Sequence, residues 1–295
     1  MEWKEKFIEQ YKKLTDIDKF TEFSLKHPRK AIRVNTIKAS ISEIKKRIPG
    51  LKQIPWCKEG FWIEGIGIGN LKEHILGYIY LQEAASMIPP IVLDPDEDDI
   101  ILDMCAAPGS KTTQLAAMMG NKGLIVANDR DMARLKPLSI NLQRCGVTNT
   151  IITLMEGRWF KTGFDKILVD APCSGIGVIR KSHKTIVTWN PNGIKAIAGI
   201  QRQLIDTAFG ILKQGGILVY STCTLEPLEN EAVIHFLVEK HKNAEILPIK
   251  LKIKSSPPVL EFDNIRYNPE IKNCLRIWPQ DNNTEGFFVA KIRKL

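Results

Sequence analysis

The sequence predicts an α/β protein whose main part is a mostly parallel sheet covered by helices on both faces. From residue 100 onward, apolar runs that read as strands alternate with stretches that carry apolar residues at helical spacing. Strands that are apolar on nearly every residue are typical of parallel sheets, because helices cover both faces of such a sheet. Ligands of these sheets bind at the carboxyl ends of the strands, so a functional site is expected at that edge.

The order of the predicted elements supports this fold class. Strands are expected at 100–104, 123–129, 150–155, 165–170 and 215–222, and two more near the end of the chain at 275–279 and 286–295. Helices are expected at 111–119, 131–145, 193–213 and 229–241. Polar residues at the strand ends should meet along one edge, namely Asp103 to Lys111, Asp129, Glu156, Asp170 to Cys173, and Ser221 to Cys223.

A smaller α/β segment is expected before the parallel sheet. Apolar residues recur at helical spacing in residues 1–27, which predicts a helix there that ends at Pro28. A short strand is expected at 31–39, and a helix at 40–48 opened by a capping box of Ser40 and Glu43. The aromatic-rich stretch 55–65 favours a small sheet. We therefore predict one domain at 1–78 and a second at 79–295.

Length and composition bound the class of protein. The chain has 295 residues, which suffices for one large domain or one with a smaller partner. Its 44% hydrophobic and 25% charged residues are ordinary for a soluble globular protein. No window approaches the 18 or so uninterrupted apolar residues of a spanning helix, and the first residues lack the apolar core of a signal peptide. The sequence predicts a cytoplasmic protein without a membrane partner.

Cysteine spacing and net charge bear on cofactors and partners. The six cysteines stand at 57, 105, 145, 173, 223 and 274, and no two have the C-x-x-C spacing of a zinc site, so no metal is expected. In a reducing cytosol they should be free thiols. The formal net charge is +9. This excess fits a basic surface kept for solubility or a polyanionic partner such as nucleic acid, and the charge alone does not decide.

The run DMCAAPGSKTTQLA (103–116) follows the first predicted strand and opens a helix. Its small residues and Gly109 favour a tight turn with room for a ligand beside the backbone. It is not a P-loop, because Ser110 separates the glycine from Lys111. Asp129 ends the second strand, where a carboxylate can accept hydrogen bonds from both hydroxyls of a ribose. The pattern indicates a cofactor that contains a nucleoside but no pyrophosphate.

Two cysteines stand at the ends of neighbouring predicted strands, in DAPCSG (170–175) and YSTCT (220–224). Adjacent strands would bring Cys173 and Cys223 close together. A thiolate is strongly nucleophilic, and a cation such as Lys111 nearby would increase the thiolate fraction. The pair beside Asp170 therefore suits covalent catalysis on an electrophilic ring carbon. The alternative, that one or both are simply buried thiols, stays open at this level.

Taken together, these runs resemble the Nop2/Sun (RsmB-like) family of RNA cytosine-5 methyltransferases. The matching runs cover about 32–292 in the family's order: IRVNT (32–36), GYIYLQEAASMIPP (77–90), DMCAAPGSKTTQLA (103–116), NDR (128–130), DAPCSG (170–175), STCTLEPLENE (221–231), LRIWP (275–279) and TEGFFVAKI (284–292). The resemblance implies a Rossmann-like class I methyltransferase domain at 79–295 and an RNA-binding segment at 1–78. Several archaeal members are similarly compact, which favours tRNA as the substrate.

The resemblance also implies a binding site for S-adenosyl-L-methionine. The loop around its methionine end would be formed by Cys105, Ala106, Ala107, Pro108, Gly109, Ser110 and Lys111. Asp129 would hold the ribose, and Arg134 and Asp170 would contact the cofactor as well. Family members usually carry aspartate near the adenine amino group, where this chain has Glu156, which can accept the same hydrogen bond. Ser110 stands where the family often has glycine, so its side chain must point away from the cofactor or add a contact.

The same resemblance implies a division of labour between the two thiols. Cys223 would attack C6 of the cytosine, which activates C5 for methyl transfer. Cys173 would help to resolve the adduct, in C5 deprotonation or in product release. Asp170 would hydrogen-bond the N3/N4 edge of the base and stabilise charge that develops in the ring. Lys111 would reach the base as well as the loop.

Two basic stretches are expected to contact RNA outside the catalytic centre. The loop 174–190 could steady backbone phosphates near a flipped nucleotide, or it could be a solvated basic loop. Its candidate residues are Arg180, Lys181, His183, Lys184 and Trp189, none of which is assigned a catalytic role. The first segment should grip RNA through Arg29, Lys30, Arg33, Lys45, Lys46 and Arg47. Its aromatic residues Trp56, Phe61 and Trp62 are expected in the core rather than on a stacking surface.

Two competing functions are weighed against this interpretation. A methyltransferase acting on an exocyclic amine needs no cysteine and typically shows Asn/Asp-Pro-Pro-aromatic, where this chain reads DAPC (170–173). A catalytically idle RNA-binding or assembly factor would not need the intact loop, Asp170 and both cysteines. The choice between tRNA and rRNA, the need for a helper protein and the oligomeric state stay open.

Overall fold

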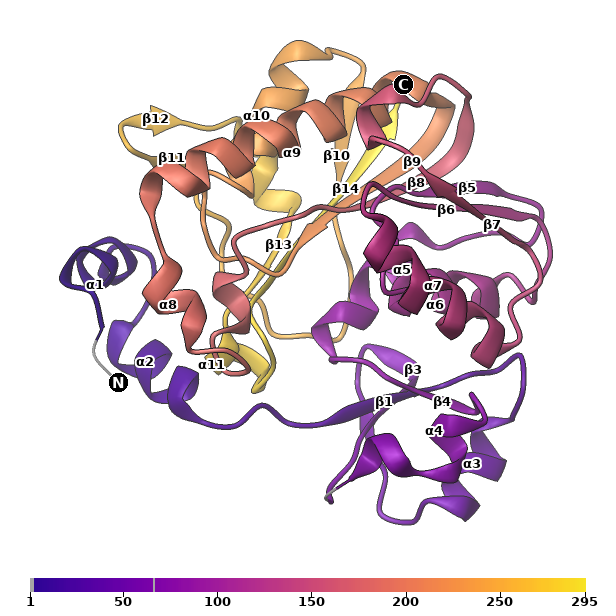
Figure 1. The fold of residues 1–295 in the computed structure, drawn as a ribbon. Helices are drawn as coiled ribbons and strands as arrows, with labels where there is room; N and C mark the ends of the chain where they lie inside the picture. The colour runs from indigo at the N-terminus through magenta and orange to yellow at the C-terminus, as the bar shows by residue number, and fades with distance from the viewer. Residues whose placement is uncertain (1–2, 66) are drawn as a thin grey trace.

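A computed structural model describes residues 3–65 and 67–295 of the chain (Figure 1). Its main sheet has eight strands in the order β10-β14-β9-β8-β5-β6-β7, with β13 paired to β14 outside this path. The strands are β5 (Ile100–Asp103), β6 (Leu124–Asp129), β7 (Thr150–Leu154), β8 (Phe164–Asp170), β9 (Leu212–Thr222), β10 (Ala244–Leu247), β13 (Leu275–Ile277) and β14 (Phe287–Lys294).

The middle of this sheet is parallel, as the sequence predicts. Strands β9, β8, β5, β6 and β7 pair in parallel, whereas β14 is antiparallel to β9 and β10 is antiparallel to β14. All seven predicted strands are present. The differences are that β10 was not predicted and that β9 begins at Leu212, three positions before the predicted start at 215. The predicted fold class, an α/β protein with a mostly parallel central sheet, is confirmed.

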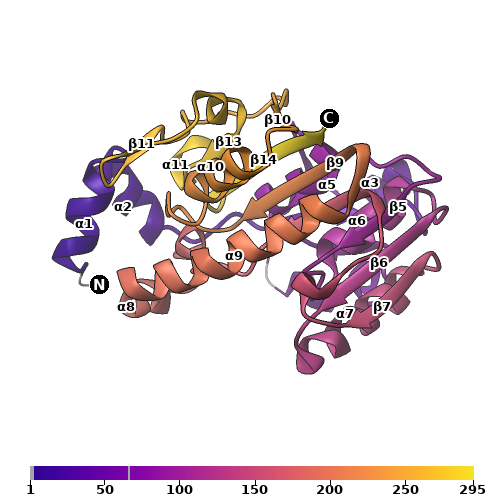
Figure 2. The same cartoon turned by 90° about the horizontal axis from the view of Figure 1, so that it is seen from above.

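Helices cover both faces of the parallel strands (Figures 1 and 2). One face carries α9 (Pro191–Ile211) and α10 (Glu231–Lys240), and the other carries α5 (Ile88–Leu93), α6 (Ser110–Met118) and α7 (Met132–Cys145). In β8, Ile167 and Val169 pack in the α9 core, whereas Leu168 between them packs with α5 and α6. Because successive side chains alternate between two apolar cores, the strand reads as a continuous apolar run.

A second, antiparallel sheet is built from the first part of the chain. Its order is β2-β3-β1-β4, with β1 (Ala31–Val34), β2 (Lys52–Ile54), β3 (Cys57–Trp62) and β4 (Ile79–Leu81). Helix α3 (Ile41–Arg47) starts at the predicted capping box, in which the Ser40 hydroxyl accepts from the Glu43 backbone N–H. Strand β4 lies just past residue 78, so this sheet extends across the predicted domain division. The division itself stays a prediction.

The predicted helix over 1–27 forms as two helices, and residues 1 and 2 lie outside the described part of the chain. They are α1 (Glu5–Lys12) and α2 (Ile17–Leu25), and the Asp16 side chain caps α2 by accepting from the Lys19 N–H. Their aromatic side chains pack on the main domain, in a cluster of Phe7, Tyr11, Phe20, Trp189 and Trp278. Residues 26–30, here called the strap, then run extended from α2 to β1 (Figure 1).

The remaining elements are short. They are η1 (Ile68–Asn70), α4 (Lys72–Ile75), η2 (Ala85–Met87), η3 (Gly157–Trp159), η4 (Ile176–Val178), α8 (Lys184–Thr188), β11 (Glu261–Phe262), β12 (Ile265–Arg266), η5 (Pro269–Asn273) and α11 (Pro279–Asn282). Within residues 3–65 and 67–295, no helix combines the length and the apolarity that a membrane crossing requires.

Candidate active site

The turn after β5 closes tightly before α6 begins. Gly109 has φ of +98° and caps the helix, a conformation that a side chain would strain. A Cβ atom at this position would lie 2.9 Å from Leu138 Cδ1 in α7. The Ala106 N–H donates to the Asn128 carbonyl at 2.7 Å, which ties the turn to the end of β6. The turn and the second strand therefore present one continuous wall at the edge of the sheet.

A cavity of about 180 Å³ opens beside this wall. Its lining includes four of the residues predicted to bind the cofactor, Cys105, Asp129, Arg134 and Glu156. Arg134 donates to the Ala107 carbonyl at 2.7 Å, and its Nη1 lies 3.1 Å from Asp129 Oδ2. The other predicted loop residues, from Ala106 to Lys111, lie on the adjoining turn and on the first turn of α6.

Two buried carboxylates at this edge have an oxygen without a hydrogen bond. Asp129 is 2% exposed and its Oδ1 accepts from the Asp131 N–H; its Oδ2 forms an ion pair with Arg134 but no hydrogen bond within the described chain. Asp103 is 1% exposed, and its Oδ1 also forms no hydrogen bond there. Buried polar atoms are normally satisfied, so these oxygens fit a ligand that brings its own donors. A ribose hydroxyl and an amino group, as in S-adenosyl-L-methionine, meet that requirement.

Asp103 belongs to this site although it was not singled out as a site residue from the sequence. Burial raises its pKa to about 7, an effect that the hydrogen bond from the Thr112 hydroxyl at 2.7 Å opposes. The neighbouring carboxylates of Asp170 and Asp129 raise it further. A signal was present, since Asp103 ends the first strand just before the predicted loop. Its burial with an unpaired oxygen is visible only in three dimensions.

Asp170, at the end of β8, is held from two sides. Lys111 Nζ lies 2.6 Å from its Oδ2, and the Ser221 hydroxyl donates to its Oδ1 at 2.7 Å. Lys111 is 7% exposed and also donates to the Ser86 hydroxyl at 3.0 Å. The carboxylate is therefore oriented before any substrate arrives. Ser86 and Ser221 are supporting residues that the sequence did not identify as such.

The two thiols meet, as expected for neighbouring strands. Asp170 and Ser221 are register partners of β8 and β9, and each cysteine follows its strand by a few residues. The sulfur atoms of Cys173 and Cys223 lie 3.3 Å apart, within hydrogen-bond distance for sulfur. The hydrogen bond with Cys223 raises the pKa of Cys173 well above its ordinary value, and burial and Glu229 add to this effect. Cys173 thus keeps its proton at neutral pH and can donate it toward Cys223.

Glu229 clamps the two cysteine loops together, and it was not predicted from the sequence. Its Oε2 accepts from the Ser174 N–H and from Gln201 Nε2, both at 2.9 Å. The Ser174 and Thr224 hydroxyls hydrogen-bond each other at 2.7 Å, which joins the residue after each cysteine. Burial raises the pKa of Glu229, against the effect of these donors. Its only sequence signal was its place in STCTLEPLENE.

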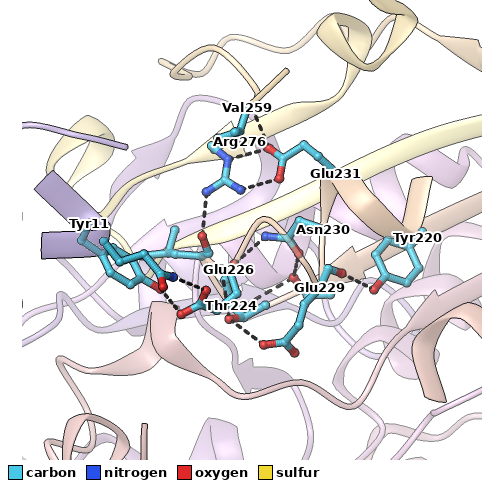
Figure 3. Close-up of polar contacts among 12 residues, drawn as sticks. Tyr11, Tyr220, Thr224, Glu226, Glu229, Asn230, Glu231, Val259 and Arg276 are labelled. Carbon is cyan, nitrogen blue, oxygen red and sulfur yellow. Dashed lines mark hydrogen bonds and ion pairs between the residues drawn. The ribbon is translucent and has the colours of Figure 1, made fainter. Parts of the chain in front are cut away.

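A buried polar network holds residues 224–231, the segment that follows Cys223 (Figure 3). Arg276 forms two hydrogen bonds to the Glu231 carboxylate, at 2.7 and 2.6 Å, and a third to the Leu225 carbonyl at 3.0 Å. Glu226 accepts from the Tyr11 hydroxyl at 2.8 Å and from Trp189 Nε1 at 2.7 Å. The segment after Cys223 is thus anchored both to β13 and to helix α1.

A close backbone approach also fixes the Cys173 loop. The Gly177 N–H donates to the Cys223 carbonyl, and the Gly286 N–H donates to the Gly177 carbonyl, both at 2.9 Å. A Cβ atom on Gly177 would lie 2.6 Å from the Cys223 carbonyl oxygen. Only glycine permits this contact, so η4 can lie directly against the Cys223 backbone.

Three residues predicted to contact RNA are buried and bonded within the protein instead. Arg33 is 1% exposed and donates to Gln82, Thr113 and the Ser110 carbonyl, so it joins the small sheet to α6. Arg180 is 4% exposed and bonds four internal acceptors. Trp189 lies in the core beneath α1. For these three the prediction was wrong, because tertiary packing uses their donors and their apolar surface.

Other basic residues of the two stretches are exposed, as contact with RNA would require: Arg29, Lys30, Lys45, Lys46, Arg47, Lys181, His183 and Lys184. Lys181 forms an ion pair with Glu285 at 2.6 Å. The expectation that Trp56, Phe61 and Trp62 lie in the core is confirmed, since all three are at most 7% exposed. Within the described chain, no group of three or more His, Cys, Asp or Glu residues is arranged to hold a metal ion.

The chain matches two family models. They are 16S rRNA methyltransferase RsmB/F over residues 90–293 and the N-terminal domain of 16S rRNA methyltransferase RsmF over residues 4–84. The chain is 46% identical to tRNA (cytosine(49)-C(5))-methyltransferase of Pyrococcus abyssi, over 100% of this chain and 99% of that protein. It is 44% identical to ribosomal RNA small subunit methyltransferase F of Aliivibrio fischeri, over 94% of this chain but only 60% of that longer protein.

Solved structures agree with these matches. A methyltransferase homolog protein from Pyrococcus horikoshii superimposes with a TM-score of 0.85 at 41% identity, covering 95% of this chain and 90% of that one. NSun6 from Pyrococcus horikoshii, crystallised with SFG, gives a TM-score of 0.84 at 28% identity, covering 99% and 98%.

The fold and these matches define an S-adenosyl-L-methionine-dependent methyltransferase. Within that class, the family model covers most of the chain and the relatives align over nearly all of it. The protein belongs to the RsmB/F family of RNA methyltransferases, which act on C5 of cytosine.

Proposed function

We propose that this protein forms 5-methylcytidine in tRNA, through a covalent intermediate on Cys223. The observation that carries the proposal is the pair of thiols 3.3 Å apart, on the same sheet edge as an Asp170 carboxylate already oriented by Lys111. Support for tRNA comes from the Pyrococcus abyssi relative, which matches over its whole length. The second candidate is rRNA, favoured by the longer relatives named for small-subunit RNA.

The cofactor would lie between the β5–α6 turn and the end of β6. S-adenosyl-L-methionine supplies an electrophilic methyl group on sulfur. Asp129 would accept from the ribose hydroxyls, with Arg134 beside it, and Glu156 would accept from the adenine amino group. The turn from Cys105 to Ser110, together with Lys111 and Asp170, would face the methionine end. The unpaired Asp103 oxygen suits the amino group of that end.

Cys223 would open the reaction as the nucleophile. Its thiolate forms a bond to C6 of the cytosine, so that electron density moves to C5, which takes the methyl group. A base then removes the C5 proton, the C5–C6 double bond re-forms, and the bond from C6 to the Cys223 sulfur breaks. Cys173 would assist the last step by donating its proton to the departing Cys223 sulfur, because the two sulfur atoms lie together and Cys173 holds its proton at neutral pH.

Asp170 would bind the N3/N4 edge of the flipped cytosine. Its carboxylate is fixed by Ser221 and Lys111, so little reorganisation is needed when the charge of the ring changes. Lys111 would keep the local charge near neutral before the base arrives and remains within reach of the base. Its pairing with Asp170 supports a role at the substrate rather than at the thiols.

The test is methyl transfer from labelled cofactor to total tRNA, with mass spectrometry for 5-methylcytidine and sequencing of the product. Cys223→Ala should abolish both methylation and any covalent RNA adduct. Cys173→Ala should instead accumulate an adduct that survives a denaturing gel. An adduct in Cys223→Ala but none in Cys173→Ala would reverse the two roles. Methylation of rRNA alone would favour the second candidate.

The proposal extends to the rest of the molecule. The part of the chain at 1–78 would bind RNA through its exposed cations, and 79–295 would form the catalytic domain. A cytoplasmic location fits a tRNA substrate and is proposed on that ground alone. Target selection would rest on the shape of the RNA around an unpaired cytidine.

A further inference from the structure

A second cavity, of about 650 Å³, lies where three parts of the chain meet. One wall is residues 27–31, from the strap to the start of β1. Another is residues 81–83, at the end of β4 and just after it. The third is Arg180 and Lys181 in the loop after Cys173. We call it the strap pocket. It is separate from the cofactor cavity, with which it shares no lining residue.

The strap pocket is held in shape by a buried cation. Arg180 donates from Nε to the Lys26 carbonyl at 3.1 Å and from Nη2 to the His27 carbonyl at 2.8 Å. It also donates to the Thr284 carbonyl at 2.9 Å and to Asn283 Oδ1 at 2.7 Å. Since four of its N–H donors are committed to these acceptors, Arg180 serves to fix the strap rather than to bind a ligand.

Two exposed cations of the pocket, Arg29 and Lys30, are not paired with carboxylates, whereas Lys181 pairs with Glu285. Arg29 lies over the Trp62 ring at 3.9 Å, and Lys30 Nζ donates to the Gly65 carbonyl at 2.8 Å. Neither forms an ion pair with a carboxylate anywhere in residues 3–65 and 67–295. Contact with the Trp62 ring positions the guanidinium of Arg29, which forms no hydrogen bond to other described residues and so suits bidentate binding of an anion.

The strap pocket adjoins the catalytic centre. Glu83 in its wall accepts from the Ser86 N–H at 3.2 Å, and the Ser86 hydroxyl contacts Lys111, which pairs with Asp170. On the opposite wall, Lys181 follows η4, whose Gly177 lies against the Cys223 backbone. One or two residues therefore separate the pocket from the groups that would hold and attack the base.

The acidic groups of this wall are engaged by the protein. Both Glu83 oxygens accept backbone N–H groups, from Ala85 and Ser86 on one side and from Glu285 on the other. Burial, and then repulsion from Glu285, raise the pKa of Glu83 above its ordinary value. Lys181 neutralises Glu285 at 2.6 Å. Arg29 and Lys30 leave the pocket with a net positive charge.

We propose that the strap pocket binds the phosphodiester next to the target cytidine, with Arg29 and Lys30 contacting its oxygens. The inference rests on the proposed function, because it takes RNA as the substrate. A nucleotide flipped toward Asp170 pulls its own backbone to the rim of the base site, and the strap pocket is the cationic cavity at that rim. Its volume suits a single nucleotide unit. Arg29 and Lys30 are thus positioning residues for the RNA strand.

The first test is the double variant Arg29→Gln/Lys30→Gln. Both residues are exposed, so the fold should be kept. Loss of two charge-assisted contacts should weaken tRNA binding roughly 10- to 100-fold. The slope of log K against log salt should become shallower by about 1 to 2. Affinity for S-adenosylhomocysteine should stay within about twofold. Binding and salt slope like those of the parent would overturn the proposal.

The matched control is Lys122→Gln/Lys213→Gln, which removes the same charge. These lysines lie beside the starts of β6 and β9, at the opposite edge of the sheet from the active site, and each forms an exposed ion pair of small energetic value. This variant should bind tRNA almost as the parent does. A loss equal to that of the pocket variant would assign the effect to net charge and contradict a specific site.

The second test removes a charge from the RNA instead of from the protein. A methylphosphonate, which is neutral, replaces each linkage next to the cytidine identified by sequencing. The parent should lose affinity for one such RNA, whereas Arg29→Gln/Lys30→Gln should lose little more. If, at both linkages, the loss from the methylphosphonate adds in full to the loss from the protein variant, the pocket does not contact either linkage. Because the readout is binding, a parent that binds RNA through these residues but transfers no methyl group would refute the proposed function alone.

Discussion

At the scale of single residues, the site depends on two pairs of side chains in close contact. Cys173 and Cys223 bring two sulfur atoms to 3.3 Å, and Lys111 and Asp170 bring opposite charges to 2.6 Å. Each pair joins the ends of different elements. The two thiols form one hydrogen bond with each other, whereas the ion pair orients the Asp170 carboxylate, which would bind the cytosine. The chemistry of each residue therefore depends on its partner.

The thiol pair predicts reversible inactivation by a mild oxidant. A disulfide needs the sulfur atoms about 2.05 Å apart, so they must approach by roughly 1.3 Å. Diamide should take two electrons and two protons from Cys173 and Cys223, leave a disulfide and stop methyl transfer, and dithiothreitol should restore it. Peptide mass spectrometry checks the pairing. Inactivation through any other cysteine pair, or full activity in oxidised protein, would contradict the prediction.

Asp103 predicts a dependence of stability on pH. Its pKa is about 7 in the folded protein against an ordinary value of 3.8, because burial disfavours the charged form. The folded state thus holds this proton more tightly than the unfolded state. The contribution of Asp103 to the free energy of unfolding is therefore complete below about pH 4 and is lost as the pH rises through 7. At about 1.4 kcal/mol per pKa unit, the loss reaches on the order of 4 kcal/mol.

The variant Asp103→Asn should lack this decline. Urea unfolding of parent and variant at pH 5 and pH 8, without cofactor, measures the free energy of unfolding of each. The free energy of unfolding of the variant should increase relative to that of the parent as the pH rises. A difference between the two proteins that is the same at both pH values would show that Asp103 titrates normally.

At the scale of elements, the loops after β8 and β9 act as one unit. Glu229 bonds the Ser174 N–H, and the Ser174 and Thr224 hydroxyls bond each other, so neither cysteine can move alone. The Gly177 contact and the Arg276–Glu231 pair hold the same unit from two further sides. Precise placement of the sulfur atoms is therefore a property of this clamp rather than of either loop.

Glu229→Gln should loosen the clamp. The Ser174 N–H and Gln201 Nε2 now donate to a carboxylate, and the NH₂ group of an amide cannot accept from them. Turnover with RNA should fall roughly 10- to 100-fold, since small misplacement of reacting atoms is costly. Binding of S-adenosylhomocysteine should not change. Disulfide formation with diamide should also slow, which separates positioning from general damage. Parent-like rates in both assays would refute this role.

At the scale of the whole molecule, two long-range connections hold the small sheet and the helical pair in place. Arg33 in β1 donates to Thr113 and to the Ser110 carbonyl in α6, both at 2.9 Å. The strap connects β1 to α2, which packs on the main domain, and Arg180 fixes it midway. The first part of the chain is therefore joined to the catalytic body at both ends, with the strap pocket between.

Arg33→Lys should weaken the first of these connections. Lysine keeps the charge but cannot reach Gln82, Ser110 and Thr113 together, and it leaves buried acceptors unpaired. The free energy of unfolding should fall by about 3 kcal/mol in urea titrations. Arg47→Lys, an exposed change in the same body, should stay within about 0.5 kcal/mol. Equal effects of the two substitutions would show that Arg33 has no special part in the stability.

Much of the main domain could be predicted because its information is local. Apolar runs such as 165–170 and helical spacing such as 193–213 reflect burial on both faces of one sheet, and the cysteines follow from the strand ends. The first segment was harder to predict. The spacing in 1–27 correctly indicated apolar helical faces but not the break at Asp16, nor that these faces pack on Trp189 and Trp278 far along the chain.

The sequence by itself determined the fold class, the family resemblance and the edge at which Asp129, Asp170, Cys173 and Cys223 gather. These follow from periodicity and from residue types at strand ends. Only the tertiary structure decided which cations face solvent, because Arg33 and Arg180 look like Arg29 until their acceptors are known. It alone placed Glu229 between the two cysteine loops. Local pattern sets the elements, whereas burial and hydrogen-bond partners depend on residues distant in the chain.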